Sequence, residues 1–150
     1  MSKINGETKE EMEAFYEKER LYLGDRYFVT IEKDKCLTLI RTFSIHYGLE
    51  TPKITFNGRT RHLCYWAKPH LSFIGYELFL GVVIHEMAHY VENSLYKNRK
   101  HDDRLMGRIL ELWKLFDPEI VNSPIERGIN YLPAAFEYYP AQQTLIKREN

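Results

Sequence analysis

The chain has 150 residues, 44% of them hydrophobic, and its 11 tyrosines and 8 phenylalanines argue against a disordered protein. That length suits one domain over residues 1–150, large enough to bury a core. The formal net charge is zero, so charge does not support a nucleic-acid partner.

The first twenty residues are charged and lack the apolar core of a secretory signal. The longest apolar run, LFLGVVI, is too short to cross a bilayer. Cys36 and Cys64 lie far apart and form no CxxC pair, which is typical of reduced, buried thiols in a chain without a signal. We therefore expect a cytoplasmic protein that makes no membrane contact.

The first part of the chain predicts two helices. An amphipathic helix is predicted over residues 7–23. Its apolar positions recur at helical spacing: Met12, Phe15, Tyr16 and Leu23. A second helix is predicted over residues 34–47, with Asp34 as its N-cap and Gly48 as its stop.

Three short strands are predicted next, because the apolar period changes after Gly48. Their sequences are KITFNG, RHLCYWA and HLSFIG. The last two flank Lys68-Pro69, so we expect them to form a hairpin.

The second half of the chain predicts a buried central helix over residues 76–96 and an amphipathic helix over 102–116, ended by Asp117-Pro118. Residues 117–150 contain further prolines and are expected to be an irregular C-terminal tail. The order of elements indicates an α+β fold in which a short three-stranded sheet packs against the central helix and flanking helices.

The central helix carries HEMAH, residues 85–89, inside an apolar segment. His85 and His89 lie one turn apart on the same face and can bind one metal ion. Glu86 projects from a neighbouring angle and can reach a water on that ion. This is the H-E-x-x-H pattern of zinc hydrolases, and a zinc ion would offset the cost of burying two imidazoles.

A catalytic zinc ion usually has three protein ligands, so a third ligand is required. His101, at the start of the last predicted helix, is the favoured candidate, because the chain between it and His89 is long enough to turn back. Glu111 is the alternative ligand, and Glu126 and Glu137 in the tail are weaker candidates.

The segment HEMAHYVENSLYKNRKHDDRL resembles the SprT-like zinc metallopeptidases, a family that includes the Spartan DNA–protein crosslink proteases. In that family H-E-x-x-H is followed about a dozen residues later by His-Gly and a bulky residue that open a helix. His101 matches this histidine and Leu105 the bulky residue, and CYWAKPHLSF resembles the family's hairpin. The resemblance covers about residues 35–116. Asp102 stands where the family has glycine, and no cysteine beyond Cys64 provides a zinc ribbon.

The resemblance implies a small zincin-like domain, one Zn²⁺ ion held by His85, His89 and His101, and endopeptidase activity on a protein substrate. It also suggests a phage or other mobile element as the source, which would place the protein in a host cytoplasm. In this mechanism Glu86 is the general base acting on a zinc-bound water, and Tyr131 is a candidate donor to the oxyanion. RHLCYWA or HLSFIG would pair with the extended substrate.

Three other patterns have weaker interpretations. The alternation of His62, Cys64 and His70 along the hairpin is not typical of a second metal site. Basic residues near the motif are interpreted mainly as a solvated turn and helix face, the alternative being that they steer an acidic substrate or contact phosphate. They are Lys97, Arg99, Lys100, Arg104 and Arg108. The alternative function is a non-catalytic, zinc-stabilised module that binds protein or nucleic acid, although the presence of Glu86 favours catalysis.

Overall fold

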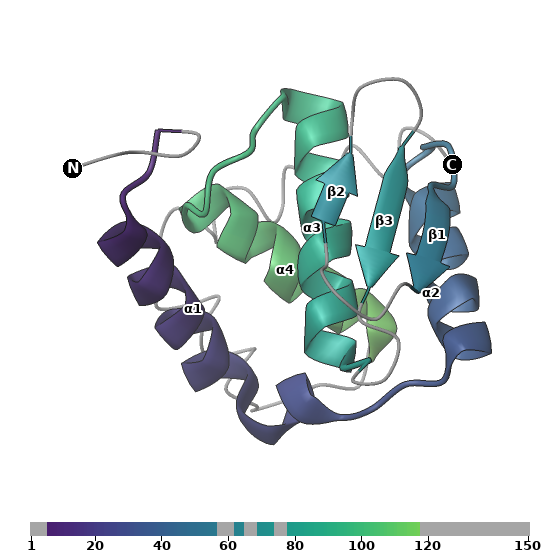
Figure 1. Cartoon of the computed structure of the whole chain (residues 1–150), viewed down its shortest axis with the longest axis horizontal. Helices are drawn as coiled ribbons and strands as arrows, with labels where there is room; N and C mark the ends of the chain where they lie inside the picture. Colours follow the sequence, from purple (N-terminus) through teal and green to yellow (C-terminus); the bar gives the residue numbers. More distant parts are fainter. Residues whose placement is uncertain (1–5, 57–61, 65–68, 74–77, 118–150) are drawn as a thin grey trace.

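The computed structural model describes residues 6–56, 62–64, 69–73 and 78–117, with the backbone alone described at 62–64. In chain order its elements are α1 (Lys9–Leu23), the 3-10 helix η1 (Gly24–Phe28), α2 (Lys33–His46), β1 (Lys53–Phe56), β2 (His62–Cys64), β3 (His70–Phe73), α3 (Leu80–Tyr96) and α4 (Asp103–Phe116) (Figure 1). This mixture of helices and strands confirms the predicted α+β class. The predicted tail lies outside the described residues, except for Asp117.

The sheet has the order β1-β3-β2. β2 and β3 are antiparallel and form the predicted hairpin, while β1 runs parallel to β3 with Ile54 opposite Leu71. β3 is therefore the central strand, paired with β1 over residues 70–73 and with β2 over residues 70–72. The suggestion that HLSFIG pairs with a substrate is wrong for this reason. Within the described residues, β2 is an edge strand.

Two helices begin later than predicted, and hydrogen bonds at their N-terminal ends explain why. The first helix begins at Lys9, because Thr8 and Glu11 form a capping box at its N-terminus. α3 begins at Leu80, because hydrogen bonds Ile31 N–H to Leu78 O and Leu80 N–H to Val29 O hold the preceding segment extended beside residues 29–31.

The two ends of α2 gave one wrong and one confirmed prediction. Asp34 is not the N-cap: Glu32 occupies that position without a side-chain hydrogen bond, and Asp34 lies in the first turn. Gly48 follows the end of the helix with φ 67°, in the left-handed region that glycine enters at little cost, and it stops the helix as predicted.

α3 is the central helix of the molecule. It contacts η1, α2, α4 and β2, and nearly all its residues from Leu80 to Asn93 are buried (Figure 1). Its apolar neighbours include Tyr27 of η1, Ile40 and Phe43 of α2, and Ile109 of α4. Cys36 also lies in this core as a free thiol, as predicted, and burial raises its pKa to about 12. None of the described helices has the length and apolar character needed to cross a bilayer.

A buried ionic network joins α3 to α4. Arg108 is fully buried and its guanidinium lies 3.2 Å from a Glu92 oxygen and 3.0 Å from a Glu111 oxygen. Arg104 pairs with the other Glu92 oxygen at 3.1 Å, and Tyr47 of α2 donates a hydrogen bond to Glu111. The prediction of a solvated face is therefore wrong for Arg108, which is buried because two carboxylates and a tyrosine surround it.

We predict that Gly81→Ala destabilises the protein by about 1–3 kcal/mol, the typical cost of overpacking a core. A Cβ at this position would lie 2.2 Å from Cδ2 of the buried Tyr27 ring, so the ring would have to shift. Urea denaturation of both proteins measures the difference. In a Tyr27→Ala background the same substitution should cost clearly less, and an equal cost in both backgrounds would contradict this packing account.

Candidate metal centre

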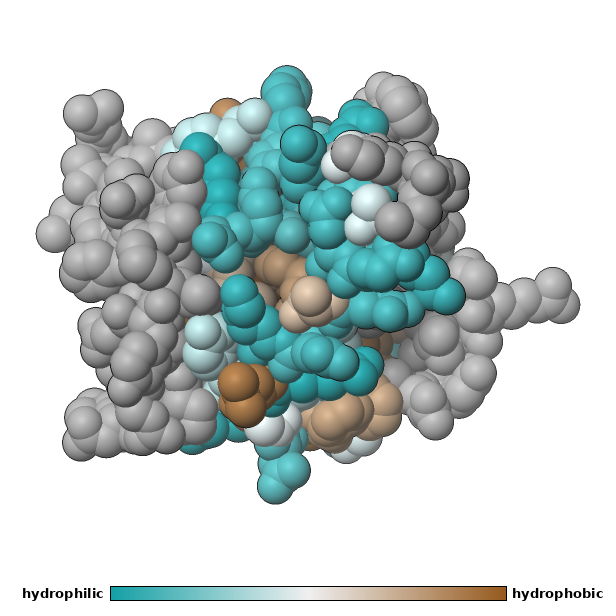
Figure 2. Space-filling model, turned by 90° about the vertical axis from the view of Figure 1, so that its left-hand side faces the viewer, coloured by the Kyte–Doolittle hydropathy of each residue, from teal (hydrophilic) through white to brown (hydrophobic). Residues whose placement is uncertain are grey.

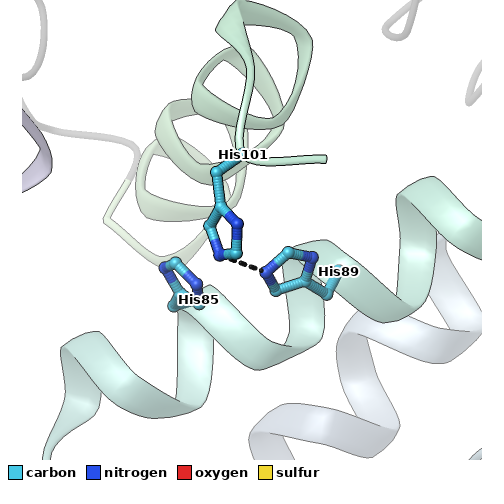
Figure 3. Close-up of side chains that lie close together, drawn as sticks. All are labelled: His85, His89 and His101. Carbon is cyan, nitrogen blue, oxygen red and sulfur yellow. Dashed lines mark hydrogen bonds between the residues drawn. The ribbon is translucent and has the colours of Figure 1, made fainter. Parts of the chain in front are cut away.

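α3 places His85 and His89 on one face, one helical turn apart, as the sequence predicted. Their ring centroids are 4.8 Å apart, and the exposed fractions of these residues are only 2% and 9%. In Figure 3 both imidazoles extend from α3 toward the same space, in front of the start of α4. Glu86, between them in sequence, lies on the same helix and is half-buried.

The turn after α3 brings His101 back to this space. α3 ends with Lys97 in the left-handed conformation, φ 58°, and the N–H groups of Lys97 and Asn98 bond to the carbonyls of Asn93 and Glu92. Asp102 then starts α4 as its N-cap by accepting a hydrogen bond from the Leu105 N–H at 3.0 Å. An aspartate at this position therefore supplies a cap immediately after His101.

The three histidines converge. Each offers one ring nitrogen, and these atoms all lie within 4.8 Å of one another. Nε2 of His89 lies 3.0 Å from Nε2 of His101, the contact drawn in Figure 3. The His101 ring is 5.4 Å from the His85 ring, centroid to centroid, and roughly parallel to it. The prediction that His101 lies with the HEMAH pair is thus confirmed as geometry.

Two glutamates contact the Nδ1 atoms of His85 and His101. Both carboxylate oxygens of Glu19, on α1, lie 3.0 Å from Nδ1 of His85, and both residues are buried. Glu7, just before α1, accepts a hydrogen bond from the His101 backbone N–H and lies 3.0 Å from its Nδ1. An ionised carboxylate only accepts hydrogen bonds, so Nδ1 is the donor in each pairing and Nε2 is the ring nitrogen left for the metal site.

The same helix, α1, lays aromatic rings over the histidines. The Phe15 ring is 5.2 Å from the His101 ring and 6.1 Å from the His85 ring, and the Tyr16 ring is 5.2 Å and 5.6 Å from them. The opposite side of α1 faces solvent, and the molecular surface on this side is mostly hydrophilic (Figure 2). The centre is therefore enclosed between α1, α3 and the start of α4.

The donor set suits zinc. Three imidazoles are the ligands of one common catalytic class, and carboxylates on the opposite nitrogens, present here behind His85 and His101, are the usual outer partners. Donors about 2.0 Å from one tetrahedral ion lie about 3.3 Å apart, so binding would draw the most separated imidazoles together by about 1.5 Å at most. These residues would hold one divalent ion, and no further cluster of this kind occurs among the described residues.

The alternative third ligand, Glu111, does not reach the centre. It is buried in the ionic network, where it accepts from Tyr47 and pairs with Arg108. Burial raises the pKa of its carboxyl to about 7, and Arg108 and Tyr47 partly oppose this shift. Glu126, Glu137 and Tyr131 lie outside the described residues.

The described residues do not support a second metal site at His62, Cys64 and His70 on the hairpin. Nε2 of His70 lies 2.9 Å from the Thr55 hydroxyl on the neighbouring strand, a cross-strand bond that accounts for a polar residue there. The side chains of His62 and Cys64 are outside the described part of the chain. A hollow of about 770 Å³ lies elsewhere, between residues 29–43 and the end of α4 at Phe116, and none of the three histidines lines it.

Sequence analysis missed Glu7, Glu19 and Tyr16. Glu19 carried a signal, because it falls on the apolar stripe of α1 between Tyr16 and Leu23, where a charged residue requires a buried partner. Glu7 carried none, since it precedes the helix and contacts a residue 94 positions away.

No protein-family model, curated protein or solved structure matches the chain.

We predict that Glu19→Gln weakens zinc binding by about 10- to 100-fold, the usual cost of losing a carboxylate behind a ligand imidazole. Competition with a fluorescent chelator measures the affinity. Glu13→Gln is the matched control, because Glu13 lies on the same helix with its side chain 62% exposed and away from the histidines. Equal losses in both variants would mean that Glu19 acts only through the general stability of α1.

We further predict that His101→Ala lowers zinc affinity by more than about 100-fold, since it removes a ligand and not just an outer partner. Glu111→Gln should leave the affinity within about 3-fold of wild type, because its carboxylate is committed to the ionic network. Zinc content after dialysis, measured on variants whose helix content is unchanged, tests both. Loss of zinc from Glu111→Gln with retention by His101→Ala would reverse the assignment.

Proposed function

We propose that the protein is a zinc-dependent metallopeptidase of the zincin type, similar to the SprT-like family. The observation that carries the proposal is the convergence of His85, His89 and His101 on one side of a buried helix that also presents Glu86. A small sheet beside a central helix is consistent with the zincin-like arrangement. The carboxylates behind His85 and His101 support a metal function over a chance cluster.

Each residue has a defined role in this proposal. His85, His89 and His101 bind the ion, and Glu7 and Glu19 fix their orientation. Zinc, when bound, supplies a Lewis acid for the scissile carbonyl and lowers the pKa of water. Glu86 takes a proton from the attacking water and delivers it to the leaving amine. A carboxylate beside the first histidine ligand has no purpose in a purely structural zinc site, which supports catalysis.

The substrate we propose is an extended polypeptide. β2 is an edge strand within the described residues and contacts α3, the helix that carries the histidines. A peptide added to β2 would satisfy the unpaired backbone groups of that edge and pass close to the active-site helix. β3 is central and already paired, so of the two segments expected to bind the substrate only the one containing β2 keeps this role.

One observation favours the alternative function, a non-catalytic module stabilised by zinc. His85 is 2% exposed, and α1 covers the centre on the side that Figure 2 displays. A structural site needs no access for a substrate, whereas a peptidase does. Activity of the Glu86 variant separates the two functions.

We predict that Glu86→Gln retains zinc but loses about 10²- to 10⁴-fold in the rate of casein or peptide cleavage, the range that general acid–base groups contribute. Glu13→Gln again serves as the exposed control and should keep full activity. Rates are measured with fluorogenic peptides on protein of known zinc content. Activity that persists in Glu86→Gln would remove this residue from the mechanism, and zinc-loaded wild type that cleaves nothing would favour the binding module.

A further inference from the structure

Tyr16 brings a fourth donor atom to the three histidines. It lies on the inner face of α1, and its hydroxyl oxygen is 3.2 Å from Nε2 of His101. Glu7 bonds to the other nitrogen of that ring, so Nε2 is the nitrogen available to an ion. The Tyr16 hydroxyl therefore contacts Nε2, the nitrogen that would bind the ion, and not Nδ1, which is bonded to Glu7.

The distances fit a shared coordination sphere. Two donors about 2.0 Å from one tetrahedral ion lie about 3.3 Å apart. The Tyr16 hydroxyl lies 3.2 Å and His89 Nε2 lies 3.0 Å from the same His101 nitrogen. Both separations are close to the distance expected between two ligands of one ion. The Tyr16 ring also lies 5.6 Å from the His85 ring, which places the tyrosine beside two of the three ligands.

The position of Tyr16 is fixed from both ends of its helix. Glu7 precedes α1 and contacts His101, while Glu19 follows Tyr16 by three residues and contacts His85. Phe15 packs against the Tyr16 ring at 6.2 Å and against His101. The same two glutamates that orient the ligand imidazoles thus hold the phenol over the centre.

We propose that the Tyr16 oxygen, as a phenolate whose proton is released to solvent when the ion binds, is the fourth ligand of the metal ion in the resting protein. This inference rests on the trihistidine site of the proposed function, but it does not require that the protein cleaves peptides. In this arrangement α1 covers the centre, and the Tyr16 oxygen occupies the coordination position that a substrate carbonyl needs. A substrate or partner must displace Tyr16, and the three histidines keep the ion while it does so.

Copper substitution provides a test that is independent of activity. Cu²⁺ bound by a phenolate gives an intense visible charge-transfer band that imidazole ligands alone do not give. We expect the wild-type protein loaded with one equivalent of Cu²⁺ to show this band, and Tyr16→Phe to lose it at equal copper content. Tyr22→Phe, also a partly buried tyrosine on α1, is the matched control and should keep the band.

The outcomes separate this proposal from the preceding one. A wild-type protein that binds copper without the band, or a Tyr16→Phe variant that keeps it, overturns the proposal. If Tyr16→Phe loses helix content, Tyr16→His keeps a ring donor and must also lack the band. With zinc, Tyr16→Phe should cleave a short unstructured peptide several-fold faster than wild type, and slower cleavage would contradict the closing role. Absence of cleavage in every variant counts against the peptidase and leaves the copper result decisive for Tyr16.

Discussion

The pairing of two carboxylates, Glu19 on α1 and Glu7 just before it, with the imidazoles of His85 and His101 is the interaction on which the rest of the centre depends. Glu19 and Glu7 each place an oxygen 3.0 Å from an Nδ1 atom, of His85 and His101 respectively. Each pairing fixes a ring orientation with Nδ1 as the donor, and so directs Nε2 toward the other histidines. Without Glu19 and Glu7 the backbone would still place the three residues near one another, but the ring orientations of His85 and His101 would lose these partners.

This dependence explains the distribution of charge in the core. Burying ionisable side chains is costly unless partners compensate them, and the molecule concentrates such residues in two groups along α3. One group is the histidine centre on the side of α1, and the other is the network of Glu92, Arg108 and Glu111 toward α4. The second group holds α4 against α3, and α4 begins directly after His101.

Sequence reasoning succeeded where local geometry determines the answer. The spacing of His85 and His89 on a helix fixes their shared face, and the length of the chain up to His101 allows its return. It failed where contacts join distant segments. Glu19 meets His85 across 66 positions, and the start of α3 at Leu80 depends on bonds to residues 29–31. The capping box at Thr8 was visible in the sequence and would have placed the start of α1 correctly.

The central claim is that three histidines bind one divalent ion, and diffraction at the zinc absorption edge tests it most directly. Crystals grown with one equivalent of zinc should show a single anomalous peak within bonding distance of Nε2 of His85, His89 and His101. The Nδ1 atoms of His85 and His101 should remain on Glu19 and Glu7. Zinc bound elsewhere at full occupancy, with the three imidazoles still in contact and no peak between them, would contradict the account.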